Sequence, residues 1–156
     1  MLFRLCELLI DSSFDPTSHV PRSAPVKHGI AANGCSFISF HLLCTKTKDK
    51  GDDVSLTDTG CNCSPVAVFD HHIASNSMVP DDAPLFAFES GKGEWSPMWH
   101  EWFLARCNQI WVLGSLSSVK GHGFRIGGTT HLLLLGMDLW IVMVQGRWSS
   151  QAFLGY

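Results

Sequence analysis

Glycine divides the apolar carboxyl-terminal stretch, residues 122–156, into short segments, and this feature constrains the fold more than any other in the chain. Glycine readily adopts the conformation that closes the last turn of a helix, so Gly136 is a predicted C-cap. Three successive helices are expected, over residues 122–135, over residues 138–146, and from Ser149 or Ser150 onward. The most apolar part, residues 132–144, is short and contains a glycine and an aspartate, which predicts packed helices and no membrane span.

The chain as a whole has the size and the apolar content of one globular domain. It has 156 residues, of which 46% are hydrophobic and 16% are charged, and this is enough apolar surface for a core. The formal net charge of −3 runs counter to the basic excess typical of nucleic-acid-binding proteins, although a local basic cleft can lie on a neutral protein. Six cysteines without a preceding secretory signal predict free intracellular thiols.

An alternating segment predicts a β-hairpin in the first half of the chain. Over residues 36–43, Ile38, Phe40 and Leu42 point to one face of a half-buried strand. Residues 45–53 form a charged turn, and residues 54–57 return as the paired strand.

Two serine–proline pairs predict further helices, because serine caps a helix and proline suits its first turn. The helices are expected over residues 64–75 and from residue 96 to residue 110. We expect a short helix over residues 1–10, a loop over residues 11–29 and an extended piece over residues 85–88. The predicted fold class is therefore mainly α with a small antiparallel β-hairpin, an α+β fold.

The carboxyl-terminal helices also carry the residues that can do chemistry. His122 and Arg125 are three residues apart and therefore lie on one face of a helix. Tyr156 follows them and is a potential covalent nucleophile. His122 and Arg125 can bind a phosphodiester, and Tyr156 can attack its phosphorus.

The segment HGFRIGGTTHLLLLGMDLWIVMVQGRWSSQAFLGY resembles the carboxyl-terminal half of tyrosine recombinases, the phage-integrase class, and is closest to recombinase-like proteins of fungal mobile elements. That family shows a His-x-x-Arg, a Thr-x-Leu, a helix-ending Gly, a Gly-His or Gly-Trp, and a Tyr. The matching residues here are His122, Arg125, Thr130, Leu132, Gly136, Gly146, Trp148 and Tyr156. Upstream, Arg4 and Glu7 fit the family's Arg-x-x-Glu, and Lys46 with Thr47 fits its hairpin lysine. The resemblance covers essentially the whole chain and implies the family's catalytic-domain fold.

The resemblance implies DNA breaking and rejoining through a 3′-phosphotyrosyl intermediate at Tyr156. Arg4 and Arg125 would hold the nonbridging phosphate oxygens, since guanidinium groups bind phosphate through paired donors. His122 would act as acid/base, and Lys46 would protonate the departing 5′ oxygen.

Supporting residues complete the implied site. Trp148 would donate its indole N–H to the phosphate, and Glu7 would orient the basic groups. The family needs no metal and no cofactor, acts on double-stranded DNA as a homotetramer, and implies an intracellular, nuclear protein. Further DNA-binding residues are expected among the remaining basic side chains Lys48, Lys50, Lys120 and Arg147.

The chain departs from the family pattern at several points. Trp148 replaces the commoner histidine, Arg147 separates it from Gly146, and Tyr156 follows after a slightly short interval. The family's helical core-binding domain does not precede Arg4, so residues 1–156 are expected to be one catalytic domain truncated at both ends.

Three of the implied site residues have a structural alternative. Arg4 can be a solvated helix residue paired with Glu7, and Trp148 can be ordinary core. Lys46 competes with Lys48 and Lys50 in one charged turn, and such turns are usually solvated.

Two other functions stay open. One is an inactive mobile-element remnant with at most weak DNA binding, which the acidic balance and the expected truncations favour. The other is a zinc-binding module, whose candidate ligands would be Cys35, Cys44, Cys61, Cys63, His71 and His72. The Cys-x-Cys spacing is tighter than that of usual structural zinc sites.

Overall fold

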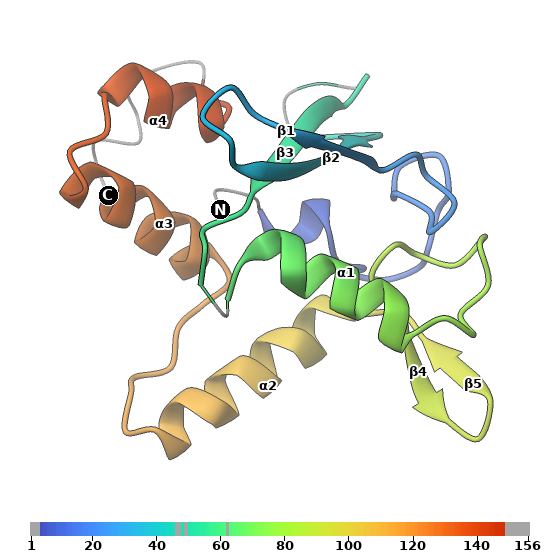
Figure 1. Ribbon diagram of the computed structural model, residues 1–156. Helices are drawn as coiled ribbons and strands as arrows, with labels where there is room; N and C mark the ends of the chain where they lie inside the picture. The colour runs from blue at the N-terminus through green and yellow to red at the C-terminus, as the bar shows by residue number, and fades with distance from the viewer. Residues whose placement is uncertain (1–3, 46–47, 49, 62, 149–156) are drawn as a thin grey trace. The chain divides into compact units, whose positions relative to one another are not determined.

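The computed structural model describes residues 4–45, 48, 50–61 and 63–148. Its elements in chain order are η1 (Leu5–Glu7), β1 (Lys27–Ile30), β2 (Ser36–Leu42), β3 (Asp52–Thr57), α1 (Pro65–Ser75), β4 (Phe88–Gly91), β5 (Glu94–Ser96), α2 (His100–Leu113), α3 (His122–Leu134) and α4 (Leu139–Gln145) (Figure 1). The described residues thus form four α-helices and two small antiparallel sheets, which confirms the α+β class.

The chain divides into two compact units. The sheet unit comprises Glu7–His100, and the helical unit comprises Met1–Cys6 with Glu101–Tyr156. The expectation that residues 1–156 act as a single domain stays a prediction.

The larger sheet has the strand order β1-β2-β3, with both pairs antiparallel. The predicted alternation along β2 is confirmed, because Ile38, Phe40 and Leu42 are all buried. Phe40 lies opposite Val54 of β3, so the two strands share one core face. The predicted hairpin is thus confirmed, although β3 begins at Asp52, two residues inside the expected turn.

Strand β1 (Lys27–Ile30) overlaps the segment expected to be loop, and that expectation was wrong over residues 27–29. Three of its four residues are exposed, so it lacks the alternation that marks a half-buried strand. Backbone pairing with β2 holds it, and Gly29 lets the Phe37 ring approach closely. A Cβ atom at Gly29 would lie 2.6 Å from Phe37 Cζ.

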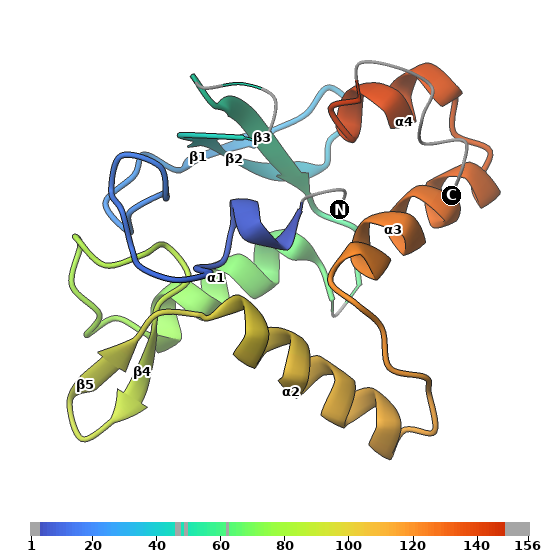
Figure 2. The same cartoon turned by 180° about the vertical axis from the view of Figure 1, so that it is seen from behind.

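Helix α1 lies against one face of this sheet (Figures 1 and 2). Its buried residue Phe69 stacks on Phe40 of β2 and meets the edge of Phe86, with ring centroids 6.2 Å apart in both pairs. The predicted span and proline start are confirmed, but the Ser64 side chain makes no capping hydrogen bond. The backbone of Ser64 begins the helix instead, because its carbonyl accepts from Val68 N–H at 2.9 Å.

The short hairpin β4–β5 also differs from expectation. The glycines Gly91 and Gly93 flank Lys92, and all three have a positive φ, which turns the chain between the strands. Ser96 therefore ends β5, and α2 begins at His100 rather than at the serine–proline pair. The extended piece expected over residues 85–88 contributes only Phe88 to a strand.

The amino-terminal helix expected over residues 1–10 is reduced, in the described part, to the single turn η1. Ile10 is buried and pairs its backbone with a distant segment. Its N–H donates to the Met98 carbonyl at 3.2 Å, and its carbonyl accepts from His100 N–H at 3.0 Å. A long-range pairing within the sheet unit thus overrides local helix propensity here.

The helical unit confirms two of the three carboxyl-terminal helices. Helix α3 ends one residue before Leu135, and Gly136 follows with a φ of 75°. Asp138 caps α4, since its side chain accepts from Trp140 N–H at 2.7 Å. The third expected helix, from Ser149 or Ser150, lies outside the described residues.

A histidine bridge links β2 to β3 and predicts a pH effect. His41 Nδ1 lies 2.8 Å from Asp53 Oδ1, and Nε2 lies 3.1 Å from the Lys50 carbonyl oxygen. The protonated ring satisfies both acceptors, and the Asp53 carboxylate raises the pKa of His41 above its usual 6.5.

The stabilisation from this bridge should be fully present below pH 6.5 and be lost as the pH rises above it. Both side chains are largely exposed, so the effect should be no more than about 1 kcal/mol. We expect His41→Gln and Asp53→Asn each to lower the free energy of unfolding at acidic pH and to converge with the wild type at alkaline pH. Parallel urea titrations across this range measure it, and a constant difference at every pH would contradict the bridge.

Candidate functional site

A buried arginine forms the centre of the candidate site in the helical unit. Arg125 of α3 is 2% exposed, and its guanidinium carbon lies 4.1 Å from the centroid of the Trp148 ring. Arg125 Nη2 donates to the Gly146 carbonyl, 21 residues further along the chain. The buried Thr129 donates its hydroxyl to the Arg125 carbonyl at 2.8 Å. The contacts therefore join Arg125 of the His-x-x-Arg motif to Gly146 and Trp148.

The turn after α4 brings Trp148 back to Arg125. Trp148 N–H donates to the Met143 carbonyl at 3.1 Å, and Arg147 has a φ of 55°. Trp148 also packs against the apolar cluster around the buried Val142. Trp148 thus packs in an apolar cluster and contacts the arginine, while its predicted hydrogen bond to phosphate stays a prediction.

Gly146 is required by this arrangement. A Cβ atom there would lie 1.6 Å from Cζ3 of the Trp148 ring, closer than any real contact. Any side chain at Gly146 must therefore displace the indole from Arg125.

Gly146→Ala is expected to destabilise the protein by about 1–3 kcal/mol, because the indole must leave its packed position. Gly127→Ala is the matched control. Gly127 lies in α3 and a Cβ atom there meets nothing within 4 Å, so alanine should stabilise the helix by about 0.5–1 kcal/mol. Urea denaturation of both variants checks this, and equal midpoints would show that the indole does not occupy this position.

His122 begins α3 and is exposed, whereas Arg125 is buried, although the two are one helical turn apart. Lys120 is exposed in the preceding loop, which is tied to α2 by two hydrogen bonds between Asn108 and Val119. Arg147 is half-buried. The expected site residues of this unit thus differ in their access to a ligand.

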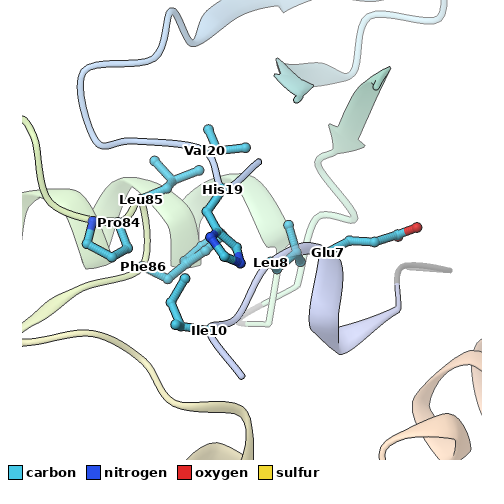
Figure 3. A pocket seen from close by; sticks show the side chains of 8 residues that line it. All are labelled: Glu7, Leu8, Ile10, His19, Val20, Pro84, Leu85 and Phe86. Carbon is cyan, nitrogen blue, oxygen red and sulfur yellow. The ribbon is translucent and has the colours of Figure 1, made fainter. Parts of the chain in front are cut away.

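The amino-terminal candidates fall in different units. Arg4 is half-buried and belongs to the helical unit, as does Arg125. Glu7 belongs to the sheet unit and lines a cavity there, with its carboxylate extending away from the other lining side chains (Figure 3). The cavity is lined by Glu7, Leu8, Ile10, His19, Val20, Pro84, Leu85 and Phe86. Its volume of about 10 Å³ holds roughly one water molecule, so it cannot accept a phosphodiester.

The charged turn between β2 and β3 carries the remaining basic candidates. Lys48 Nζ lies 2.8 Å from Asp52 Oδ2, so a carboxylate partly offsets its charge. Lys50 is exposed and its carbonyl accepts from His41. Lys46 and Tyr156 lie outside the described residues, and their roles stay predictions.

Two contributors to the candidate site were not predicted as such. Thr129 is fully buried beside Arg125, and its place one turn after the arginine was the available signal. The steric role of Gly146 could be suspected only from its position two residues before a tryptophan.

The described part of the chain contains no group of three or more His, Cys, Asp or Glu side chains placed to hold a metal ion. None of its helices combines the length and the apolar character that a membrane crossing requires. No protein-family model, curated protein or solved structure matches the chain.

Proposed function

We propose that this chain is a tyrosine-recombinase catalytic domain that cleaves and rejoins DNA through a 3′-phosphotyrosyl link to Tyr156. The observation that carries the proposal is the contact between two motifs of the resemblance. Arg125 of the His-x-x-Arg motif lies over Trp148 and donates to Gly146, the two residues that match the family's Gly-Trp with Arg147 between them. Residues that the family pattern groups by function are thus in contact although they are far apart in sequence.

The proposed reaction conserves a phosphoester bond. The Tyr156 phenolate attacks the scissile phosphorus, the bond from phosphorus to the 5′ oxygen breaks, and Lys46 gives that oxygen its proton. His122 takes and returns the phenolic proton. Rejoining is the reverse step, so the reaction needs no ATP, and its charge stabilisation comes from arginine rather than from a metal.

The two proposed phosphate ligands are Arg4 and Arg125, both in the helical unit. Arg125 is 2% exposed, so the side chains that cover its guanidinium must move before its N–H groups can bind phosphate oxygens. We propose double-stranded DNA as the partner, a homotetramer on DNA as the assembly, and the nucleus as the site of action.

The burial of Arg125 also favours a second candidate, an inactive remnant that no longer cuts DNA. In that case the Arg125–Trp148 contact is purely structural. The net charge of −3 points the same way.

Covalent trapping separates the two candidates. The full chain is incubated with a pool of nicked duplexes of randomised sequence, in which the cleaved strand loses the fragment needed for rejoining. The recombinase proposal predicts a protein–DNA adduct that survives denaturation. A chain that is folded by circular dichroism and forms no adduct with any duplex in the pool supports the remnant and contradicts the enzyme.

A further inference from the structure

Two exposed thiols lie in the turn that precedes α1 in the sheet unit. Cys61 and Cys63 are both exposed and are two residues apart. Ser64 N–H donates to the Cys61 carbonyl at 2.9 Å. Residues two apart in a chain have Cα atoms no more than about 7 Å apart, close to the range that a disulfide spans.

The surroundings of Cys61 favour its thiolate. Thr59 Oγ1 lies 3.1 Å from Cys61 Sγ and can donate its hydroxyl hydrogen to the sulfur. This contact, helped by the backbone N–H of Cys63, lowers the pKa of Cys61, while the nearby Asp58 carboxylate acts in the opposite sense. Thiolate character and exposure are the two properties that make a cysteine react with peroxide.

Three of the four other cysteines differ from this pair. Cys35 and Cys107 are half-buried, and burial raises the pKa of Cys107. Cys44 is exposed, and its thiol donates to the Thr45 carbonyl at 3.8 Å. Accessibility, a donor to sulfur and a neighbouring thiol therefore coincide at Cys61.

We propose that Cys61 and Cys63 are a peroxide-oxidised thiol pair that closes to an intrachain disulfide at the start of α1. The Cys61 thiolate attacks one oxygen of hydrogen peroxide, the O–O bond breaks, and the departing hydroxide takes up a proton as water. The sulfenic acid on Cys61 is then attacked by the Cys63 sulfur. The S–O bond breaks, and the Cys63 proton leaves with the hydroxide as a second water. Two thiols are oxidised by two electrons, and one peroxide is reduced to two waters.

Tryptic digestion isolates the pair. Residues 51–92 contain no internal lysine or arginine and carry only Cys61 and Cys63. Residues 28–46 are the matched control for peptide mapping, since, with cleavage after Lys27 and Lys46, they carry Cys35 and Cys44. The reduced full chain is treated with hydrogen peroxide, alkylated and mapped by mass spectrometry over time.

We expect peroxide to oxidise the peptide of residues 51–92 at least about tenfold faster than the control peptide. The oxidised peptide should be lighter by two hydrogen atoms and should no longer be alkylated. Dithiothreitol should restore it. Cys63→Ser should stop at a sulfenic acid on Cys61 that dimedone traps, and Thr59→Val should slow the reaction. Equal oxidation rates for the two peptides, or a Cys63→Ser variant that yields no trapped sulfenic acid, would overturn the proposal.

Discussion

Replacement of Arg125 by alanine should lower the free energy of unfolding by about 2–4 kcal/mol. The substitution leaves the buried Gly146 carbonyl without its arginine donor and removes the group beneath the Trp148 ring. Both losses fall on the contact that joins α3 to the turn after α4. Urea denaturation followed by circular dichroism measures the change, and hydrogen exchange should show it first in α3 and α4.

Two further variants control this experiment. Arg106 of α2 is exposed and bonds only locally to Gln109 among the contacts described, so Arg106→Ala should change stability by no more than about 0.5 kcal/mol. Arg125→Lys keeps a positive charge but loses the planar group, and should be intermediate. If Arg125→Ala proves as mild as Arg106→Ala, Arg125 is not buried in the contact described.

The Arg125 variants also separate folding from chemistry. In a folded Arg125→Lys protein, the recombinase proposal predicts a large loss of adduct, because lysine cannot bind two phosphate oxygens through a planar fork. A purely structural arginine would show loss of stability alone.

Gly51→Ala should destabilise the sheet unit by at least about 3 kcal/mol. Gly51 is buried in the turn between β2 and β3 and has a φ of 70°. A Cβ atom there would lie 1.7 Å from the Leu42 carbonyl oxygen. That oxygen belongs to the backbone of β2 and cannot rotate away, so the strand pairing must change.

Gly60→Ala is the control for backbone conformation alone. Gly60 has a φ of 67°, but a Cβ atom there meets nothing within 4 Å. Alanine should therefore cost only the left-handed conformation, about 1–2 kcal/mol. Thermal unfolding of the two variants gives the comparison, and similar melting temperatures would contradict the close approach of Gly51 to β2.

Local signals predicted part of the fold. The apolar alternation of Ile38, Phe40 and Leu42 fixed a strand, and Asp138 marked the start of α4. Strand β1 escaped prediction because most of its residues are exposed and only its backbone pairs with β2. The start of α2 was misplaced because Ser96 pairs in a hairpin, and no local preference reveals that pairing.

The candidate site was predictable in composition but not in exposure. The spacing of His122 and Arg125 placed both on α3, and the structure has them there. That Arg125 is buried while His122 is exposed depends on Gly146 and Trp148, which lie more than 20 residues away. Helical periodicity carries no information about such a distant partner. The spacing of His122 and Arg125 therefore predicted the same exposure for both side chains.

The central claim is that Tyr156 becomes covalently joined to DNA, and the identity of the joined residue tests it most directly. Tyr156 is the single tyrosine of the chain, so a phosphotyrosine link identifies it without ambiguity. Nuclease digestion of the trapped adduct, followed by peptide mapping, should find a 3′-phosphate on Tyr156 and a free 5′ hydroxyl on the released strand. Tyr156→Phe should form no adduct. A strand joined through its 5′ end, joined to another residue, or still joined in Tyr156→Phe would contradict the account.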